Sequence, residues 1–487
     1  MEDEREVPLL KKVYYEDCPG CKIEKRKDTD DSIPWKLLAS IWIIVLCNAL
    51  PISSLFPFLY FMIRDFHIAE QEEDVGYYAG FVGSAFMFGR ALTSVIWGKL
   101  ADRYGRKPII IIGTIAVVIF NTMFGLSVNF WMAVSTRFLL GSLCGLLGPA
   151  KAYVSEVCRE EHQAVGMSMI TTAWGIGLII GPALGGLLSQ PAEKYPQMFS
   201  PESLFGRFPY FLPCLITSAF AAVITVGSFW LPESLHMHKS KNLSGDDSYE
   251  ALEAASNCAD EKSSGKEIEG QADVSTKSLF RNWPLMSSII VYCIFSLHDM
   301  AYTEIFSLWA VSPRKLGGLS FSSEDVGVVL SITGFGMMVF QLILYPYMNK
   351  FLGPVMFARI CGALSIPLLQ SYPFLALLSG LSLSIFLNSA SIIKNCLSVC
   401  IITSTFILQN RAVEQDQRGA ANGLSMTAMS IFKAIGPACG GALLSWSEKR
   451  QDASFLPGTH MVFFLLNVVE LVGVVLTFKP LLVERKD

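Results

Sequence analysis

The stretch GMSMITTAWGIGLIIGPALGGLLS at residues 166–189 recurs, one residue shorter, as GLSMTAMSIFKAIGPACGGALLS at residues 423–445. The two copies begin at Gly166 and Gly423, 257 residues apart, and the same offset places Arg137 opposite Lys394. A repeat of this length predicts that the chain is built from two related halves, and every other feature of the sequence can be placed within that plan.

Composition shows what kind of halves these are. Of the 487 residues 52% are hydrophobic and only 16% are charged, and the mean hydropathy is +0.44, whereas soluble chains have about a quarter charged residues. Most of the apolar blocks reach the ~20 residues that cross a bilayer. The blocks are 41–60, 76–100, 109–126, 130–150, 164–188, 210–230, 284–311, 326–348, 354–370, a tract within 374–408, 420–444 and 461–478. We therefore predict an all-α polytopic membrane protein with twelve transmembrane helices in two six-helix bundles. The boundary hardest to place lies within 372–409.

The predicted domain plan has five parts. A cytoplasmic N-terminal segment (1–35) precedes the first bundle (36–231), a cytoplasmic linker (232–283), the second bundle (284–480) and a cytoplasmic tail (481–487). Residues 239–278 are rich in Ser, Asp, Glu, Lys and Gly, so we expect them to be disordered. Lys and Arg concentrate in the loops on the side of the termini, including Lys151 and Arg159, which predicts that both termini are cytoplasmic.

Several classes of protein are excluded by what the chain lacks. We find no signal-peptide pattern, no nucleophile–base set, no P-loop and no basic, aromatic-rich segment typical of nucleic-acid binding. An enzyme, an ATP-driven pump and a nucleic-acid partner are therefore not expected, and no cofactor is implied. The twelve cysteines lie mostly in apolar spans or in segments facing the cytosol, so we expect no disulfide framework.

The loop GKLADRYGRKP at 98–108 joins the second and third predicted helices. Its glycines permit tight turns, and its charges can form an inter-helix lock that breaks in another conformation; the alternative is that the basic residues only fix topology. This loop resembles the signature of the major facilitator superfamily, whose fold of two six-helix bundles the chain matches over nearly its whole length. The equivalent stretch YPYMNKFLGP at 345–354 keeps only the outline. The predicted lock residues are Gly98, Asp102, Arg103, Gly105, Arg106 and Lys107.

Two further motifs fit this resemblance. Arg137, in RFLLGSLCG, lies roughly 10 Å deep in the fourth span, where the family places an Arg linked with proton coupling; the alternative is a side chain that snorkels to the interface. The fifth span reads GIGLIIGPALGG and resembles the motif of the antiporter branch, although small residues at this spacing also occur in simple helix packing. Its residues are Gly177, Gly181, Pro182, Gly185 and Gly186.

Ionisable residues inside other spans are candidates for proton coupling or substrate binding, because charge within a bilayer is costly. The seventh span, FSLHDMAYTEIFSLW at 295–309, contains His298 and Asp299 deep inside and Glu304 nearer the outer mouth, where we expect it to be hydrated. Asp299 and Glu304 are ~140° apart around the helix, so they cannot both face one narrow cavity. His298 and Asp299 are either a proton relay or a satisfied polar contact between helices. Three cations complete the set: Arg90, Lys394 and Lys433. Arg90 and Lys433 would suit an anionic or zwitterionic substrate, or they pair with the acidic residues of the seventh span.

A narrower resemblance rests on CPGC at 18–21, PESLHMH at 232–238, SLFGRF at 203–208 and QNRAVEQDQRGAANG at 409–423. Together they are similar to the plant zinc-induced facilitator-like transporters. Two thiols and two imidazoles, Cys18, Cys21, His236 and His238, could bind cytosolic Zn²⁺ as a regulatory site, and a structural use without metal is an equal alternative.

This resemblance implies proton-coupled transport of a small solute, most readily solute/proton antiport, across the vacuolar or plasma membrane. Solutes of that family include nicotianamine and phytosiderophores, linked to zinc and iron homeostasis, and also potassium and auxin-linked substrates. A non-transporting metal sensor is a further alternative.

Overall fold

The computed structural model describes residues 14–15, 18–235, 279–413 and 418–482. These residues form helices and loops, with no strand among them. The helices before the linker are α1 (Pro19–Thr29), α2 (Trp35–Ser53), α3 (Leu59–Asp65), η1 (Glu72–Asp74), α4 (Val75–Tyr104), α5 (Arg106–Ala116), η2 (Val117–Asn121), α6 (Thr122–Gly125), α7 (Phe130–Leu143), α8 (Leu147–Val157), η3 (Glu160–His162), α9 (Gln163–Leu188), α10 (Pro191–Lys194), α11 (Leu204–Arg207) and α12 (Phe211–Ser228). Those after it are α15 (Trp283–Val311), η4 (Arg314–Leu316), α16 (Ser323–Leu352), α17 (Pro354–Leu375), α18 (Gly380–Arg411), α19 (Arg418–Glu448) and α20 (Thr459–Leu476).

Within the described residues, eleven helices are long and apolar enough to cross a membrane, and bent α4 makes up to twelve. Two of the spans are composite, because α5, η2 and α6 run on as one and α7 and α8 are separated only by residues 144–146. The boundary that the sequence left open falls at residues 376–379, between α17 and α18. The prediction of an all-α polytopic membrane protein is confirmed.

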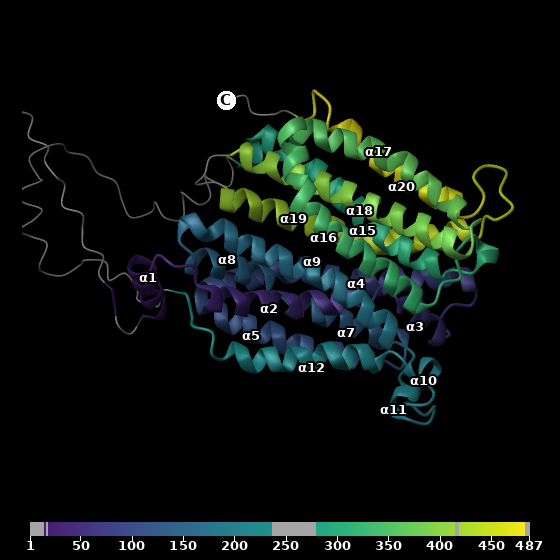
Figure 1. The fold of residues 1–487 in the computed structure, drawn as a ribbon, viewed down its shortest axis with the longest axis horizontal. Helices are drawn as coiled ribbons and strands as arrows, with labels where there is room; N and C mark the ends of the chain where they lie inside the picture. The colour runs from purple at the N-terminus through teal and green to yellow at the C-terminus, as the bar shows by residue number, and fades with distance from the viewer. Residues whose placement is uncertain (1–13, 16–17, 236–278, 414–417, 483–487) are drawn as a thin grey trace, which may run out of the picture.

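The helices form two bundles that lie side by side (Figure 1). Helices α2–α12 make up the first and α15–α20 the second, each with its own apolar core between its helices. Figure 1 shows α1 at one end of the bundles, which we call the α1 end, and α3, α10 and α11 at the other, which we call the far end.

Two helix pairs join the halves, α4 with α19 and α9 with α16. Each hydrogen bond or ion pair between the halves that the described residues make uses residues 72–84 or 179–194 of the first half. These residues lie in the far-end parts of the joining helices or in the loops beyond them. The far end is therefore closed.

Towards the α1 end the joining helices separate. A Cβ atom added at Gly98 of α4, Gly175 of α9 or Gly423 of α19 would meet no other atom within 4 Å. Many residues in these parts of α4, α9 and α16 are half-buried or exposed, whereas residues 82–86 of α4 are buried. The space between the halves is thus open towards the α1 end.

Candidate functional site

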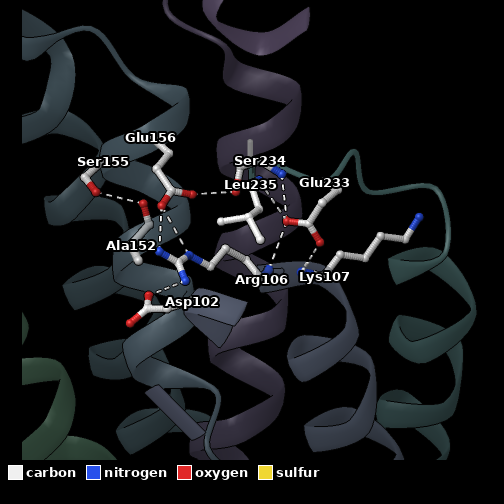
Figure 2. Close-up of polar contacts among 9 residues, drawn as sticks. All are labelled: Asp102, Arg106, Lys107, Ala152, Ser155, Glu156, Glu233, Ser234 and Leu235. Atoms are coloured by element: carbon white, nitrogen blue, oxygen red, sulfur yellow. Dashed lines mark hydrogen bonds and ion pairs between the residues drawn. The ribbon is translucent and has the colours of Figure 1, made fainter. Parts of the chain in front are cut away.

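Arg106 is the centre of a charged network at the turn between α4 and α5 (Figure 2). Its Nη1 lies 2.6 Å from Asp102 Oδ1, and its Nη2 lies 2.8 Å from Glu156 Oε1 on α8. Arg106 is buried and Asp102 is exposed, so the contact with Glu156 is the better shielded of the two from salt. Arg103 lies outside the network, exposed, with its guanidinium 5.4 Å from the centre of the Tyr104 ring. The network links three spans of the first half.

Glu233, which follows α12, caps the N-terminus of α5. Its Oε1 accepts a hydrogen bond from the Arg106 backbone N–H at 2.9 Å, and its Oε2 accepts one from the Lys107 N–H at 3.0 Å. A carboxylate is favourable there because the first N–H groups of a helix lack partners within it. Ser234 Oγ donates to Glu156 Oε2 at 2.6 Å, so the segment after the sixth span is bound to the network on both sides.

Gly105 is required at this turn for two reasons. Its φ of +108° lies in the region that favours glycine, and a Cβ at this position would clash with the Glu233 carboxylate. Gly98 faces open space instead. Lys107 Nζ donates to the backbone carbonyl of Phe229 at 2.6 Å. The structure therefore brings together Asp102, Gly105, Arg106 and Lys107 and leaves Gly98 and Arg103 apart; a locking role for the network stays a prediction.

The glycines of α9 divide between two faces of the helix. One face packs directly on α2, where Ser53 Oγ donates to the carbonyl of Gly177 at 2.8 Å. A Cβ would clash at each of three positions on that face, namely Gly177 with Ala49, Gly181 with Ser53 and Gly185 with Ser54. These three glycines therefore allow α2 and α9 to lie in backbone contact within the first half.

Pro182 and Gly186 lie on the face of α9 that contacts the second half. A Cβ at Gly186 would approach the Ser323 carbonyl to 2.6 Å, and a Cβ at Gly327 of α16 would approach the Pro182 carbonyl to 2.6 Å. The repeat in α19 divides in the same way. There, Gly436 and Gly440 pack on α15 within the second half, whereas Pro437 and Gly441 pack on α4 of the first.

Arg137 on α7 is only 2% exposed, which excludes a side chain that snorkels to the interface. Its Nη1 donates to the carbonyl of Pro51 in α2 at 3.0 Å, and its guanidinium carbon lies 5.1 Å and 5.2 Å from the ring centres of Phe86 and Phe124. Its Nε has no hydrogen-bond partner among the described residues. The guanidinium is thus held in place by aromatic rings and one carbonyl, with no carboxylate in direct contact.

Lys394 on α18, the repeat counterpart of Arg137, is 1% exposed. Its Nζ donates to Ser398 Oγ and lies 4.3 Å from the centre of the Tyr302 ring. The hydroxyl of Tyr302 is 2.8 Å from that of Tyr372. Both halves therefore bury a cation against aromatic rings at equivalent positions.

His298 contacts a residue that the sequence analysis did not single out. Its Nδ1 lies 2.8 Å from Glu470 Oε2 on α20, and both side chains are 2% exposed. The other ring nitrogen, Nε2, is buried without a hydrogen-bond partner in the described part of the chain. A carboxylate within the apolar run 461–478 was the available signal for Glu470.

Glu304 does not lie at a hydrated mouth, so that prediction is wrong. The residue is 1% exposed, because α4 and α19 cover it from the two halves. A Cβ added at Gly83 of α4 would lie 3.0 Å from Glu304 Oε2 and 3.1 Å from Pro437 Cβ. Asp299, which the sequence placed deeper in the span than Glu304, is only partly buried.

Four half-buried charges from both halves lie near one another, on α4, α8, α15 and α19. Arg90 of α4 lies within electrostatic range of Lys151 and Lys433, and Lys433 lies within range of Asp299. None of the four side chains forms a hydrogen bond or ion pair with another described residue. Lys151, which the sequence placed in an inner loop, is on α8 and joins this group. Three cations and one acid are therefore available to a ligand.

The chain is similar to known proteins in both sequence and fold. Residues 41–412 match the family model described as Major Facilitator Superfamily. The chain belongs to the major facilitator superfamily. Protein ZINC INDUCED FACILITATOR 1 of Arabidopsis thaliana is 61% identical to it over 485 residues, which cover 100% of this facilitator and 99% of the relative. A probable peptide/nitrate transporter of the same plant is 57% identical over 485 residues, covering 98% of each chain. The predicted resemblance to zinc-induced facilitator-like proteins is thus confirmed.

Solved facilitator structures share the fold. A bacterial homologue of the human lysosomal transporter Spinster, in an inward-facing and unoccupied conformation, aligns with a TM-score of 0.68 at 13% identity. The alignment covers 92% of this facilitator and 97% of that chain. The two-bundle architecture is therefore that of superfamily transporters.

The N-terminal cysteines of this facilitator lie at the start of α1. Cys18 and Cys21 are buried, and α1 is attached to the end of α8, where Arg159 forms an ion pair with Asp31 and donates to the carbonyl of Lys27. His236 and His238 lie outside the described residues. Within the described part, no three His, Cys, Asp or Glu residues are grouped so that they could hold a metal ion. A zinc site at these motifs stays a prediction.

Proposed function

We propose that this facilitator is a proton-coupled secondary active transporter, a solute/proton antiporter, of a small organic zwitterion or anion. Nicotianamine or a phytosiderophore is the substrate class we favour, which would link the protein to zinc and iron homeostasis. The observation that supports this most directly is the set of unpaired charges between the halves: Arg90, Lys151, Lys433 and Asp299.

The signs of these charges favour an organic substrate over a bare metal ion. Three cations repel Zn²⁺, whereas they attract several carboxylates, and Asp299 can accept an ammonium group. Nicotianamine-type chelators combine carboxylates with amines. One relative, at 57% identity, is named a probable peptide/nitrate transporter, and peptides and nitrate are zwitterionic or anionic solutes.

A buried pair in the second half and a buried cation in the first half are our candidates for proton coupling, in addition to the substrate charges. The His298 ring and the Glu470 carboxylate lie 2.8 Å apart in the second half, and such a pair can share a proton. In the first half the candidate is the buried cation Arg137. In this proposal the α1 end faces the cytosol, and the membrane is that of the vacuole or the plasma membrane.

Transport by sealed proteoliposomes tests the proposal. We expect labelled nicotianamine or phytosiderophore to accumulate when a pH gradient is imposed in one direction, and to stop when a protonophore is added. Arg90→Ala and Lys151→Ala should weaken uptake, whereas Lys36→Ala, which removes an exposed cation at the α1 end, should not. Asp299→Asn or Arg137→Ala should uncouple solute from proton flux. Absence of uptake of both chelators by the wild type would overturn the substrate assignment.

The same screen covers the alternatives. Uptake of potassium or auxin, with no uptake of either chelator, would favour a potassium/proton or auxin-linked transporter of the same fold. Stoichiometric zinc binding that is lost in Cys18→Ser/Cys21→Ser, without any solute flux, would favour a metal sensor.

A further inference from the structure

Glu304 is a buried acidic residue whose described neighbours give its carboxylate no hydrogen bond. The side chain is 1% exposed, and neither carboxylate oxygen has a hydrogen-bond partner among the described residues. The other two buried acids of the second half differ in this respect, because Glu470 lies against His298 and Glu448 has a side-chain hydrogen bond with Ser312. An ionised carboxylate without donors is costly in such a site, whereas the neutral acid is much less so.

The groups around Glu304 come from both halves. From the first half, Gly83 of α4 is placed so close that an added Cβ would be 3.0 Å from Oε2, and from the second, Pro437 of α19 borders the same space. Neither residue offers a hydrogen-bond donor from its side chain. Among the described residues, the charged group within electrostatic range is Arg137 on α7, which donates to the Pro51 carbonyl instead.

We infer that Glu304 binds a proton whenever the far end is closed and loses it when the halves separate there. The inference rests on the proposed function and adds to it a switch by which far-side protons control closure of the far end. A proton from the far-side solution adds to the carboxylate while the far end is open, and the neutral side chain then fits between α4 and α19. Conversely, when these helices part, water solvates the carboxylate and Arg137 favours its charged form.

The arrangement couples protonation to conformation through packing. The contact next to Glu304 is made by small residues, and one helical position further on, the Ala438 N–H donates to Ser84 Oγ at 2.7 Å across the halves. An anion at Glu304 would place an unsolvated charge beside this interface. Protonation therefore stabilises the closed far end, and deprotonation favours its opening.

Hydrogen exchange of the full-length protein in lipid nanodiscs tests the inference, with peptides covering residues 75–86 of α4 as the readout. After correction for intrinsic rates, wild-type exchange should be slower at about pD 5.5 than at about pD 7.5, by up to about tenfold per unit for one coupled proton. Glu304→Gln, which mimics the neutral acid, should show the slow rate at both values. Glu304→Asp should restore the dependence, and Asp452→Asn, at an exposed far-end position, should leave it unchanged. Wild-type-like pD dependence in Glu304→Gln, or none in the wild type, would overturn the inference.

A transport assay separates failure of this inference from failure of the proposed function. If the proposed function holds, Glu304→Gln should transport the solute more slowly than the wild type, since the neutral side chain holds the far end closed. Slower transport by the variant, with wild-type exchange behaviour, would place Glu304 outside the conformational coupling and contradict the inference. If the wild type transports none of the tested solutes, the exchange experiment still decides the role of Glu304.

Discussion

Gly105 and Gly98 belong to the same loop motif, but their surroundings predict opposite responses to substitution. Gly105→Ala should destabilise the protein, because φ is +108° and the new Cβ would clash with Glu233. A strained backbone of this kind costs about 1–3 kcal/mol, before displacement of the α5 cap is counted. Gly98→Ala should be neutral or stabilise by about 0.5–1 kcal/mol, because it adds a helix-favouring residue in open space. Thermal unfolding of the two purified variants measures the difference. Equal melting temperatures would contradict the role given to Gly105.

At the residue scale, the sequence showed which ionisable residues lie within the spans better than it showed which residues they contact. The buried residues His298 and Glu304 could be recognised, because ionisable residues in apolar runs are rare and costly. Their contacts could not, since His298 meets Glu470 and Gly105 meets Glu233 across large separations in the chain. The error on Glu304 has the same cause. Its position along the helix was counted correctly, but the helices that cover it belong to other parts of the sequence.

At the scale of elements, α9 offers a matched test of helix packing. Gly181→Ala should weaken the contact between α2 and α9, since the added methyl would clash with Ser53. Overpacking of this kind costs about 1–3 kcal/mol. Gly175→Ala, on the same helix but facing open space, should be tolerated. Melting temperature and the monodisperse fraction in size-exclusion chromatography are the measurements. A loss with Gly175→Ala as large as with Gly181→Ala would show that helix propensity or insertion, and not this contact, determines the outcome.

Most spans could be predicted because length and hydropathy suffice to identify a helix that crosses a membrane. The internal repeat further indicated that α9 and α19 are equivalent, and both helices pack through glycines on one neighbour in their own half and one in the other. The short connection between α17 and α18 was not predictable, because residues 376–379 contain no charge or proline to interrupt the apolar tract.

At the scale of the whole molecule, the sequence predicted two related bundles but not which end between them is open. A transporter needs at least two arrangements of similar free energy, so no single residue pattern specifies one of them. The structure shows the closed far end directly. Its outermost contacts are ion pairs between the halves, Lys315 with Glu72 at 2.7 Å and Lys449 with Asp74 at 2.6 Å.

These two ion pairs should bias the equilibrium towards the closed far end. Exposed pairs are worth about 0.2–1 kcal/mol each, so Lys315→Ala/Lys449→Ala should shift the population by roughly two- to thirty-fold towards opening. Faster exchange of the α4 peptides 75–86 would report the shift, and high salt should produce part of the same effect in the wild type, because it screens exposed charges. Arg207→Ala is the control, since it removes an exposed cation near the same end whose guanidinium carbon lies 5.7 Å from the centre of the Phe208 ring in its own half. Unchanged exchange in the double variant would mean that the apolar contacts of α4 with α19 and of α9 with α16 close the far end without help from the charges.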